Sequence, residues 1–434
     1  KTDRDPKELL FSFKRCMVHF AVDDARVKFC TKLAGKSSWF LPFDRGYNDG
    51  AGNPPNPEGI MTDYLWTEIL TKFSLADIIE NYAQVVIEEN KKTKKKTEKQ
   101  IFPRYHQLTV VRSLLADVKD KGMGQKYLIQ HSAGSGKSNS IAWLAHQLVG
   151  IEASGVAIVD SVIVVTDRVN LDKQIHDTIK QFMQVSSTVG HAESSGGEKG
   201  LKDLIQQGKK IIITTVHKFP FILDDIGTAH KGSKFAIIID EAHSSQSGDM
   251  SAKMNIVLGG DFDPNADKED IINALMEGRK MLTNASYFAF TATPKNKTLE
   301  MFGVPVLQTD GTFKYYPFHN YSMKQAIQEG FILDVLKYYT PIKSFYKLIK
   351  TVTDNPEYDK KKAQKKLRAY VESDNFAIAT KAGIMVEHFH DSVCRKIEGQ
   401  ARAMVVTSSV ERAIEYYFAI CSALEARKSQ YKAI

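Results

Sequence analysis

The sequence predicts an α/β fold in which a parallel β-sheet is covered by helices on both faces. Five short, nearly continuous apolar runs rich in β-branched residues recur along the chain, as expected of strands buried on both faces. Helical patterns separate most of these runs, which favours crossover connections and a parallel sheet. A glycine-rich loop follows the first run. The predicted strands are 127–130, 162–166, 210–215, 235–239 and 287–291.

Composition restricts the class of protein. With 434 residues, 43% apolar and 25% charged, the chain has the composition of a globular protein and the length for two or three domains. The net charge of +8 permits a polyanionic partner without requiring one. The four cysteines, Cys16, Cys30, Cys394 and Cys421, show no paired ligand spacing, which favours a reducing compartment and a cytoplasmic location. No apolar run approaches the roughly 20 residues that cross a bilayer, so no membrane partner is expected.

The N-terminal part is expected to be helical or irregular. Residues 1–62 alternate aromatic patches with a Gly/Asn/Pro-rich loop, and apolar spacing over 63–90 predicts one or two helices. The tract KKTKKKTEK, with six lysines, predicts a solvated linker over 91–100, with a phosphate-contacting arm as the alternative. Asp77 with Glu89-Asn90-Lys91 spells a metal-dependent nuclease motif, but helical periodicity makes chance the better explanation.

The loop after the first predicted strand has the residue types of a nucleoside triphosphate site. Glycines let backbone N–H groups approach phosphate oxygens closely, and the following helix directs its positive end at them. Lys137 would reach the β and γ phosphates, and the Ser138 hydroxyl would bind Mg²⁺. His131 stands where a glycine is usual, at the loop's entry. A Gly/Ser turn that happens to contain lysine is the alternative. The residues expected to contact the nucleotide here are Ala133, Gly134, Ser135, Gly136, Lys137 and Ser138.

Acidic and hydroxyl side chains end two other predicted strands. The run FAIII ends in Asp240 and Glu241, two adjacent carboxylates that suit different roles. Asp240 would hold the Mg²⁺ shell, and Glu241 would polarise the attacking water. A solvated acidic pair is the alternative. The run YFAF leads to Thr291 and Thr293 near the same edge of the sheet, where a plain turn would serve as well.

Upstream of the loop, FPRYHQ ends in Gln107, whose amide could pair with an adenine edge through one donor and one acceptor. Taken alone, a cap at the start of a helix is the better interpretation of this glutamine.

A second α/β unit starts near residue 335. Strands are expected at 336–340 and 403–407, and helices at 354–372, 376–397 and from 408 through Arg427. Two strands do not close a layered domain of this type, so the unit is expected to be incomplete. The predicted domains are 1–90, 91–100, 101–320 and 321–434.

With these motifs assembled, the chain resembles helicase superfamily 2 motors, and more closely the R (restriction) subunits of type I restriction-modification enzymes. The resemblance rests on FPRYHQ, AGSGKS, VIVVTDRVNLDKQ, DEAHSSQSG, FTATP and MVVTSSVERA, in this order, and on the early FLPFDRGYNDGAGNP. It covers nearly the whole chain. It implies a RecA-like first lobe at 101–320, a partial RecA-like second lobe at 321–434, and a linker between nuclease and motor at 1–90.

The resemblance also implies ATP and Mg²⁺ as cofactors, and translocation of double-stranded DNA leading to cleavage, together with methylation and specificity subunits. The nuclease core would precede Lys1, and motifs V and VI would follow Ile434. His243, Thr291 and Thr293 would couple the ATP site to movement. Candidate DNA contacts, with surface solvation as the alternative, are Thr166, Arg168, Lys218, Thr407 and Ser408. A stand-alone superfamily 2 helicase or remodeller, and a nucleotide-gated binding module without turnover, are the competing hypotheses.

Overall fold

The chain forms two compact units, Lys1–Lys337 and Tyr338–Ile434. The computed structural model describes residues 5, 8–89, 94, 96–166, 179, 189–191, 204, 207–215, 232–240, 282–334, 375–396, 399–429 and 431.

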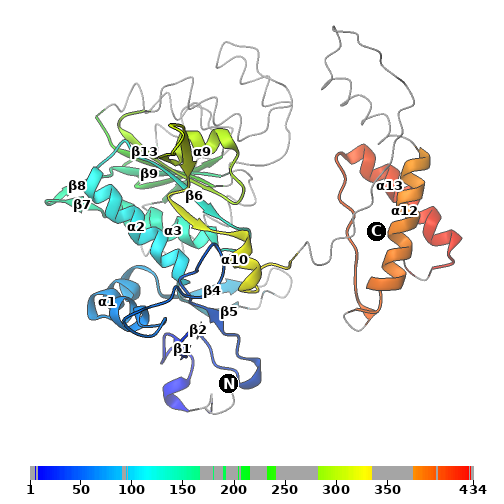
Figure 1. Cartoon of the computed structure of the whole chain (residues 1–434), viewed down its shortest axis with the longest axis horizontal. Helices are drawn as coiled ribbons and strands as arrows, with labels where there is room; N and C mark the ends of the chain where they lie inside the picture. The colour runs from blue at the N-terminus through cyan, green and yellow to red at the C-terminus, as the bar shows by residue number, and fades with distance from the viewer. Residues whose placement is uncertain are drawn as a thin grey trace, which may run out of the picture. The chain divides into compact units, whose positions relative to one another are not determined.

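A parallel sheet forms the centre of the first unit (Figure 1). Within the described residues it has seven strands in the order β10-β11-β9-β12-β13-β6-β16, and every pairing is parallel. The strands are β6 (Lys126–His131), β9 (Ser161–Thr166), β10 (Val189–His191), β11 (Ile211–Thr215), β12 (Phe235–Asp240), β13 (Ala285–Thr291) and β16 (His319–Tyr321). All five strands predicted from apolar runs are confirmed. The short strands β10 and β16 were not predicted.

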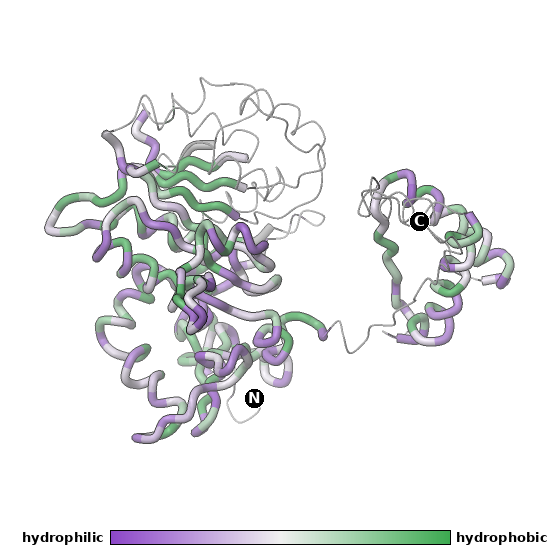
Figure 2. Tube along the Cα trace, turned by 45° about the horizontal axis from the view of Figure 1, so that its top comes forward, coloured by the Kyte–Doolittle hydropathy of each residue, from purple (hydrophilic) through white to green (hydrophobic). Residues whose placement is uncertain are grey.

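The sheet is buried on both faces, as its apolar runs predict. Every residue of β9, β12 and β13 is buried, and the central strands are uniformly hydrophobic in Figure 2. Helices α2 (Tyr105–Lys121) and α3 (Lys137–Val149) pack side by side against one face (Figure 1). The side chains of Val164 and Ile238 enter this core, while Ile163 and Ile237 on the opposite face are also fully buried.

The N-terminal part is more regular than predicted. It contains a small antiparallel sheet of β1 (His19–Val22), β2 (Val27–Cys30) and β3 (Leu41–Pro42), with single helical turns at Leu9–Phe11 and Gly35–Ser37. Rings from Phe29, Phe43, Phe102 and Tyr105 pack with centroids 5.5 to 6.1 Å apart. The N-terminal sheet therefore shares one hydrophobic core with α2 and α3.

The region 63–100 is partly helical and partly a β-hairpin. A π-helical turn, Leu65–Ile69, and α1 (Lys72–Asn81) agree with the predicted helices. The strands β4 (Gln84–Glu89) and β5 (Lys96–Ile101) then pair antiparallel. The helix prediction is therefore wrong over 84–89, and the linker prediction is wrong over 96–100. Val86 is buried while its neighbours Val85 and Ile87 are exposed, which is the alternation of a strand.

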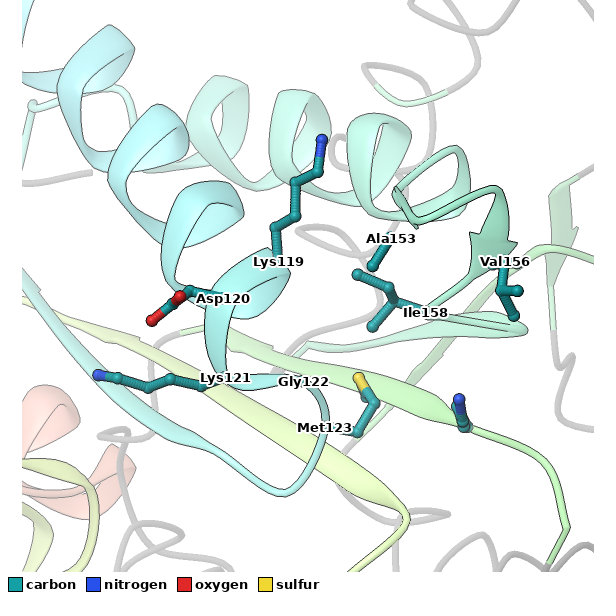
Figure 3. A pocket seen from close by; sticks show the side chains of 10 residues that line it. Lys119, Asp120, Lys121, Gly122, Met123, Ala153, Val156 and Ile158 are labelled. Atoms are coloured by element: carbon teal, nitrogen blue, oxygen red, sulfur yellow. The ribbon is translucent and has the colours of Figure 1, made fainter.

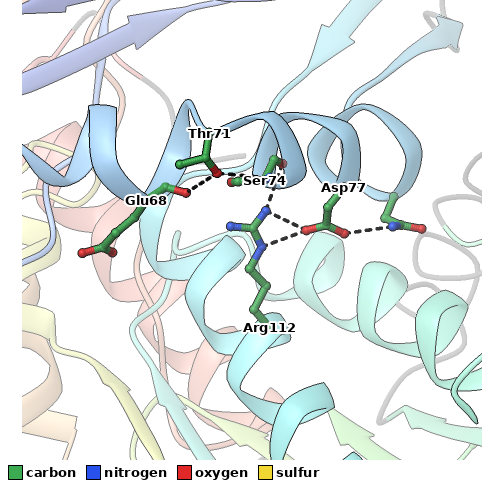
Figure 4. A network of polar contacts seen from close by, with 6 residues as sticks. Glu68, Thr71, Ser74, Asp77 and Arg112 are labelled. Atoms are coloured by element: carbon green, nitrogen blue, oxygen red, sulfur yellow. Dashed lines mark hydrogen bonds and ion pairs between the residues drawn. The ribbon is translucent and has the colours of Figure 1, made fainter. Parts of the chain in front are cut away.

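A bidentate ion pair joins α1 to α2. Both Nε and Nη2 of Arg112 donate to Asp77 Oδ2, at 2.8 and 2.6 Å, and Nη2 also reaches the carbonyl of Ser74 (Figure 4). Asn81 donates to the second carboxylate oxygen of Asp77 at 2.9 Å. Asp77 is thus a structural residue on a helix, in agreement with chance as the origin of the nuclease-like spelling.

The first unit continues beyond its predicted end. A boundary after residue 320 would cut β16, which pairs with β6 in the main sheet, so that boundary is wrong and the compact unit extends to Lys337. The remaining elements of this unit are β7 (Glu152–Ala153), β8 (Val156–Ala157), α9 (Asn296–Phe302), β14 (Val304–Leu307), β15 (Phe313–Tyr316) and α10 (Met323–Gln328).

The second unit contains two packed helices, α12 (Asn375–His388) and α13 (Val410–Ala426), and a π-helical turn at Phe389–Val393. These agree with the helices predicted at 376–397 and through Arg427. Residues 403–407, predicted as a strand, are not in one. The predicted strand at 336–340 and helix at 354–372 lie outside the described residues. None of the helices described in either unit could cross a lipid bilayer.

Candidate nucleotide-binding site

A tight loop connects β6 to α3. Gly134 and Gly136 have φ of 73° and 78°, a left-handed conformation that L side chains adopt only with strain. The N–H of Ser135 donates to the carbonyl of Ser132 at 3.3 Å, closing a turn. Helix α3 begins at Lys137 directly after Gly136. The strand, loop and helix context predicted for a phosphate site is therefore present.

His131 fits its position because the backbone there is not left-handed. The ring is fully buried beneath the loop, and its Nε2 lies 2.9 Å from Nδ1 of His319 on the neighbouring strand β16. One nitrogen of this pair must donate and the other accept, which two neutral imidazoles do. Burial holds the pKa of His131 well below the ordinary 6.5 and lowers the pKa of His319 to about 4, so both rings are neutral at pH 7.

The side chain of Lys137 folds back over the loop. It is 8% exposed, and its Nζ donates to the carbonyl of His131 at 3.3 Å, across the loop from the start of α3. Ser138 follows in the first turn of α3, half-buried. The Lys137 cation thus lies across the loop, and Ser138 lies in the first turn of the helix that follows it.

Three strand ends meet at the carboxyl edge of the sheet. The register aligns Asp240 with Phe290, and Phe290 with Ile129, so β13 lies between the acidic strand end and the phosphate loop. Two strand spacings separate them, about 10 Å. Thr291 lies beside Gln130, the residue before the loop's entry. Asp240 and Thr291 are 2% and 0% exposed.

Gln107 acts as a helix cap in this structure. Its Oε1 accepts from the N–H of Arg104 at 3.0 Å, and its Nε2 donates to the carbonyl of Gly136 at 2.9 Å. The amide therefore makes protein hydrogen bonds with both of its ends. This geometry agrees with the capping interpretation, and adenine recognition by Gln107 stays a prediction.

The start of α2 contributes two residues that the sequence analysis did not assign. Arg104 Nη1 donates to the carbonyl of Gly134 at 3.1 Å, and its guanidinium lies 3.6 Å from the ring centroid of Phe331. His106 Nε2 lies 3.0 Å from the carbonyl of Ser135. Both belong to the quoted run FPRYHQ, so their proximity to Gln107 was an available signal.

Other predicted site residues also follow strand ends: Thr166 ends β9 level with Asp240 on β12, and Thr293 comes two residues after β13. Thr166 is fully buried and its hydroxyl donates to the carbonyl of Thr214 at 3.4 Å; its contact with DNA stays a prediction. The side chain of Thr293 is exposed, and its N–H donates to Thr291 Oγ1 at 3.4 Å. Glu241, His243, Arg168 and Lys218 lie outside the described residues.

Thr407 and Ser408 belong to the second unit, just before α13. The Thr407 hydroxyl donates to the carbonyl of Ser409, and Ser408 is exposed. Their predicted contact with DNA stays a prediction.

A hollow of about 330 Å³ opens at the opposite edge of the sheet (Figure 3). Lys119, Lys121 and Lys234 surround it, with Met123 and Ile158 among its apolar residues. It lies at the amino ends of β6 and β12, away from the phosphate loop. This hollow is therefore not the nucleotide site.

A parallel sheet whose carboxyl edge holds a phosphate loop, a buried aspartate and a threonine strand end defines a RecA-like nucleotide-binding lobe. Residues 106–369, more than half of the chain, match the SWI2/SNF2 ATPase family. The chain belongs to this family.

Curated relatives are endonuclease subunits of type I restriction enzymes. A subunit from Staphylococcus saprophyticus is 27% identical over 217 residues, covering 47% of this chain and 18% of the relative. A C-terminal part from Mycoplasma pneumoniae is 29% identical over 164 residues, covering 35% of this chain and 76% of the relative. A subunit from Methanocaldococcus jannaschii is 23% identical over 353 residues, covering 74% of this chain and 28% of the relative. The chain thus spans less than a fifth of the length of the Staphylococcus saprophyticus subunit.

Two solved structures are similar to the chain. A fragment assigned to an HsdR subunit of a type I restriction enzyme from Vibrio vulnificus has a TM-score of 0.43 and 14% identity, covering 90% of this chain and 56% of the fragment. The SWI2/SNF2 ATPase core of Sulfolobus solfataricus in complex with double-stranded DNA has a TM-score of 0.28 and 13% identity, covering 44% of this chain and 33% of that structure's chain.

Proposed function

We propose that the chain is the ATP-driven motor of a type I restriction endonuclease R subunit, which translocates double-stranded DNA toward cleavage of unmethylated DNA. The observation that carries the proposal is the meeting of the phosphate loop, Asp240 and Thr291 at one edge of a parallel sheet. Membership of the SWI2/SNF2 ATPase family and the restriction-enzyme relatives support the same conclusion.

In this proposal the chain's own residues bind and orient ATP. The loop amides and Lys137 hold the β and γ phosphates, and Glu241 polarises the attacking water. Ser138 and Asp240 offer the hard oxygen ligands that Mg²⁺ prefers; Ser138 is in the first turn of α3, and Asp240 is buried at the end of β12, at the same edge of the sheet. When bound, Mg²⁺ would neutralise charge on the β and γ phosphate oxygens. Thr291, Thr293 and His243 are proposed to couple hydrolysis to movement.

Partners and location belong to the same proposal. We assign double-stranded DNA, with Arg168, Lys218, Thr407 and Ser408 as its proposed contacts, and the methylation and specificity subunits of a restriction-modification complex. A cytoplasmic location is proposed because all four cysteines are free thiols.

The test is ATP hydrolysis by the full-length protein with and without duplex DNA. Lys137→Ala and Glu241→Gln should each lower DNA-stimulated hydrolysis at least about 100-fold, since each removes a charge or base aimed at the reacting phosphate. Lys126→Ala is the matched control, because this exposed lysine lies at the opposite end of β6 and should leave the rate unchanged.

Undiminished hydrolysis in either active-site variant would refute the assigned roles. Wild-type protein that binds ATP without hydrolysing it would favour a nucleotide-gated binding module. A native chain without any nuclease domain would favour a stand-alone helicase or remodeller.

A further inference from the structure

Three successive carbonyls of the phosphate loop are held by side chains from the start of α2. Gly134 O accepts from Arg104 Nη1 at 3.1 Å, Ser135 O accepts from His106 Nε2 at 3.0 Å, and Gly136 O accepts from Gln107 Nε2 at 2.9 Å. These donors are distant from their acceptors in sequence, by 29 or 30 residues. The loop's carbonyl side is therefore fixed by one helix terminus.

This arrangement determines where the loop's amides point. In a trans peptide the carbonyl of one residue and the N–H of the next lie on opposite sides. Holding Ser135 O and Gly136 O toward α2 turns the N–H groups of Gly136 and Lys137 to the opposite side of the loop. Backbone N–H groups aligned in this way form the concave nest that binds phosphate oxygens.

His106 is a buried imidazole at the middle of this set of donors. It is 6% exposed, and its ring stacks on Tyr321 with centroids 3.8 Å apart and planes 20° apart. Because a carbonyl only accepts, Nε2 of His106 carries the proton. The Tyr321 hydroxyl donates to Glu329 Oε2 at 2.6 Å, which fixes the ring on which His106 stacks.

We propose that His106 is a positioning residue of the ATP site: its Nε2–H holds the Ser135 carbonyl so that the Gly136 amide faces the polyphosphate. The inference deepens the proposed function and rests on the site being a nucleoside triphosphate site. His106 touches no substrate, and it acts through the loop. Stacking on Tyr321 orients the imidazole, and the hydrogen bond carries the effect to the loop.

Two substitutions separate the hydrogen bond from the ring. His106→Phe keeps an aromatic ring on Tyr321 and removes the donor, while His106→Gln keeps a donor near Nε2 and removes the ring. In the full-length protein, affinity for a fluorescent ATP analogue with Mg²⁺ should fall about tenfold in His106→Phe, because the Ser135 carbonyl loses the shorter of its two side-chain hydrogen bonds and keeps only Gln107 Nε2 at 3.3 Å. His106→Gln should stay within about threefold of wild type. The KM for ATP should follow the same order, with kcat changing less.

Amide hydrogen exchange gives a readout independent of turnover. Exchange of the peptide 131–138 should quicken in His106→Phe and stay near wild type in His106→Gln. His146→Phe is the matched control, since this half-buried histidine lies in the last turn of α3 and should change neither measurement. Thermal unfolding reports whether each variant is folded.

Wild-type affinity and wild-type loop exchange in folded His106→Phe would overturn the inference. An equal loss in His106→Gln would also overturn it, because the ring and not the donor would then matter. Wild-type protein that binds the analogue without hydrolysing ATP would refute the proposed turnover, while the stated order of the two variants would still support the role of His106.

Discussion

At position 136 any side chain would meet the amide of Gln107. A Cβ there would lie 2.5 Å from Gln107 Nε2, and φ is 78°. Gly136→Ala should lower the free energy of unfolding by about 1 kcal/mol through left-handed strain. It should also displace the Gln107 amide and weaken binding of an ATP analogue, measured by titration of the full-length protein.

Gly122→Ala is the matched control for this change. Gly122 has a similar φ of 74° at the end of α2, but a Cβ there would meet no atom within 4 Å. Its ψ of −162°, against 37° at Gly136, lies in a region essentially limited to glycine, so Gly122→Ala should lose more stability in urea unfolding while nucleotide affinity stays unchanged. Unchanged affinity in Gly136→Ala as well would contradict the proposed role of Gln107 as a support of the loop.

Single residues of the site were predictable where one short motif carries the chemistry. Lys137 and Asp240 stand next to apolar strands in the sequence, so their place at the sheet edge follows from local pattern alone. The role of His106 was not predictable, because its acceptor is 29 residues later and its stacking partner Tyr321 belongs to β16. Thr166 was assigned to DNA from its motif, yet its side chain is buried, because β9 is covered on both faces of the sheet.

Strands could be predicted from the sequence where both of their faces are buried. The prediction failed where a strand is mostly exposed and polar and contacts residues that are distant in sequence. The buried strands β9, β12 and β13 are recognisable as apolar runs. In β5, by contrast, four of the six residues are exposed and none of those four is apolar, so nothing local indicates a strand. Gln100 donates to the carbonyl of Met17, and Lys14 pairs with Glu98 at 2.6 Å. These contacts hold the hairpin against the N-terminal region. They cannot be predicted from the sequence of the lysine tract itself.

The histidine pair between β6 and β16, His131 and His319, should make the protein less stable in acid. Burial lowers the pKa of His319 to about 4, below the roughly 6.5 of an unfolded chain. The unfolded chain therefore binds the proton first as the pH falls, and the free energy of unfolding decreases between about pH 6.5 and pH 4. Allowing for the partial exposure of His319, the loss by pH 5 should be about 1 kcal/mol, measured by urea unfolding at pH 7 and pH 5.

His319→Asn isolates this contribution. The Asn amide can accept through Oδ1 or donate through Nδ2, so it can pair with His131 Nε2 in either direction, but it does not titrate. The difference in stability between pH 7 and pH 5 should shrink by about 1 kcal/mol. His388→Asn is the matched control, because it makes the same substitution at an exposed position of α12. A pH dependence identical to wild type in His319→Asn would show that the buried pair does not govern acid stability.

At the scale of the molecule, the boundary that the sequence suggested differs from the boundary of the compact unit in the structure. The lysine tract suggested a boundary near residue 100, yet Phe102 and Tyr105 pack on Phe43, and Tyr105 also packs on Tyr64, in the core that continues through α2 and α3. Residues up to Lys337 form one compact unit. The N-terminal region is therefore part of the body that carries the ATP site, and a cut near residue 100 would expose its aromatic core.

Binding of duplex DNA should depend on salt through the proposed basic contacts. Each phosphate neutralised by a lysine or arginine contributes about −0.9 to the slope of log affinity against log salt. Lys218→Ala should therefore weaken binding and reduce the slope by about 0.9. Ser408→Ala, at an exposed site before α13, should weaken binding without changing the slope, because a hydroxyl releases no counterion.

Lys119→Ala distinguishes a directed DNA contact from a general effect of net charge. Lys119 is exposed beside the hollow at the amino edge of the sheet (Figure 3), and the proposed ATP site lies at the carboxyl edge. If DNA is held by the residues proposed here, anisotropy of a labelled duplex between roughly 50 and 200 mM salt should give a wild-type slope for this variant. A reduced slope in Lys119→Ala with a wild-type slope in Lys218→Ala would instead assign the DNA path to the lysine-lined hollow. Equal reductions in both would mean that total charge, and not a defined surface, governs binding.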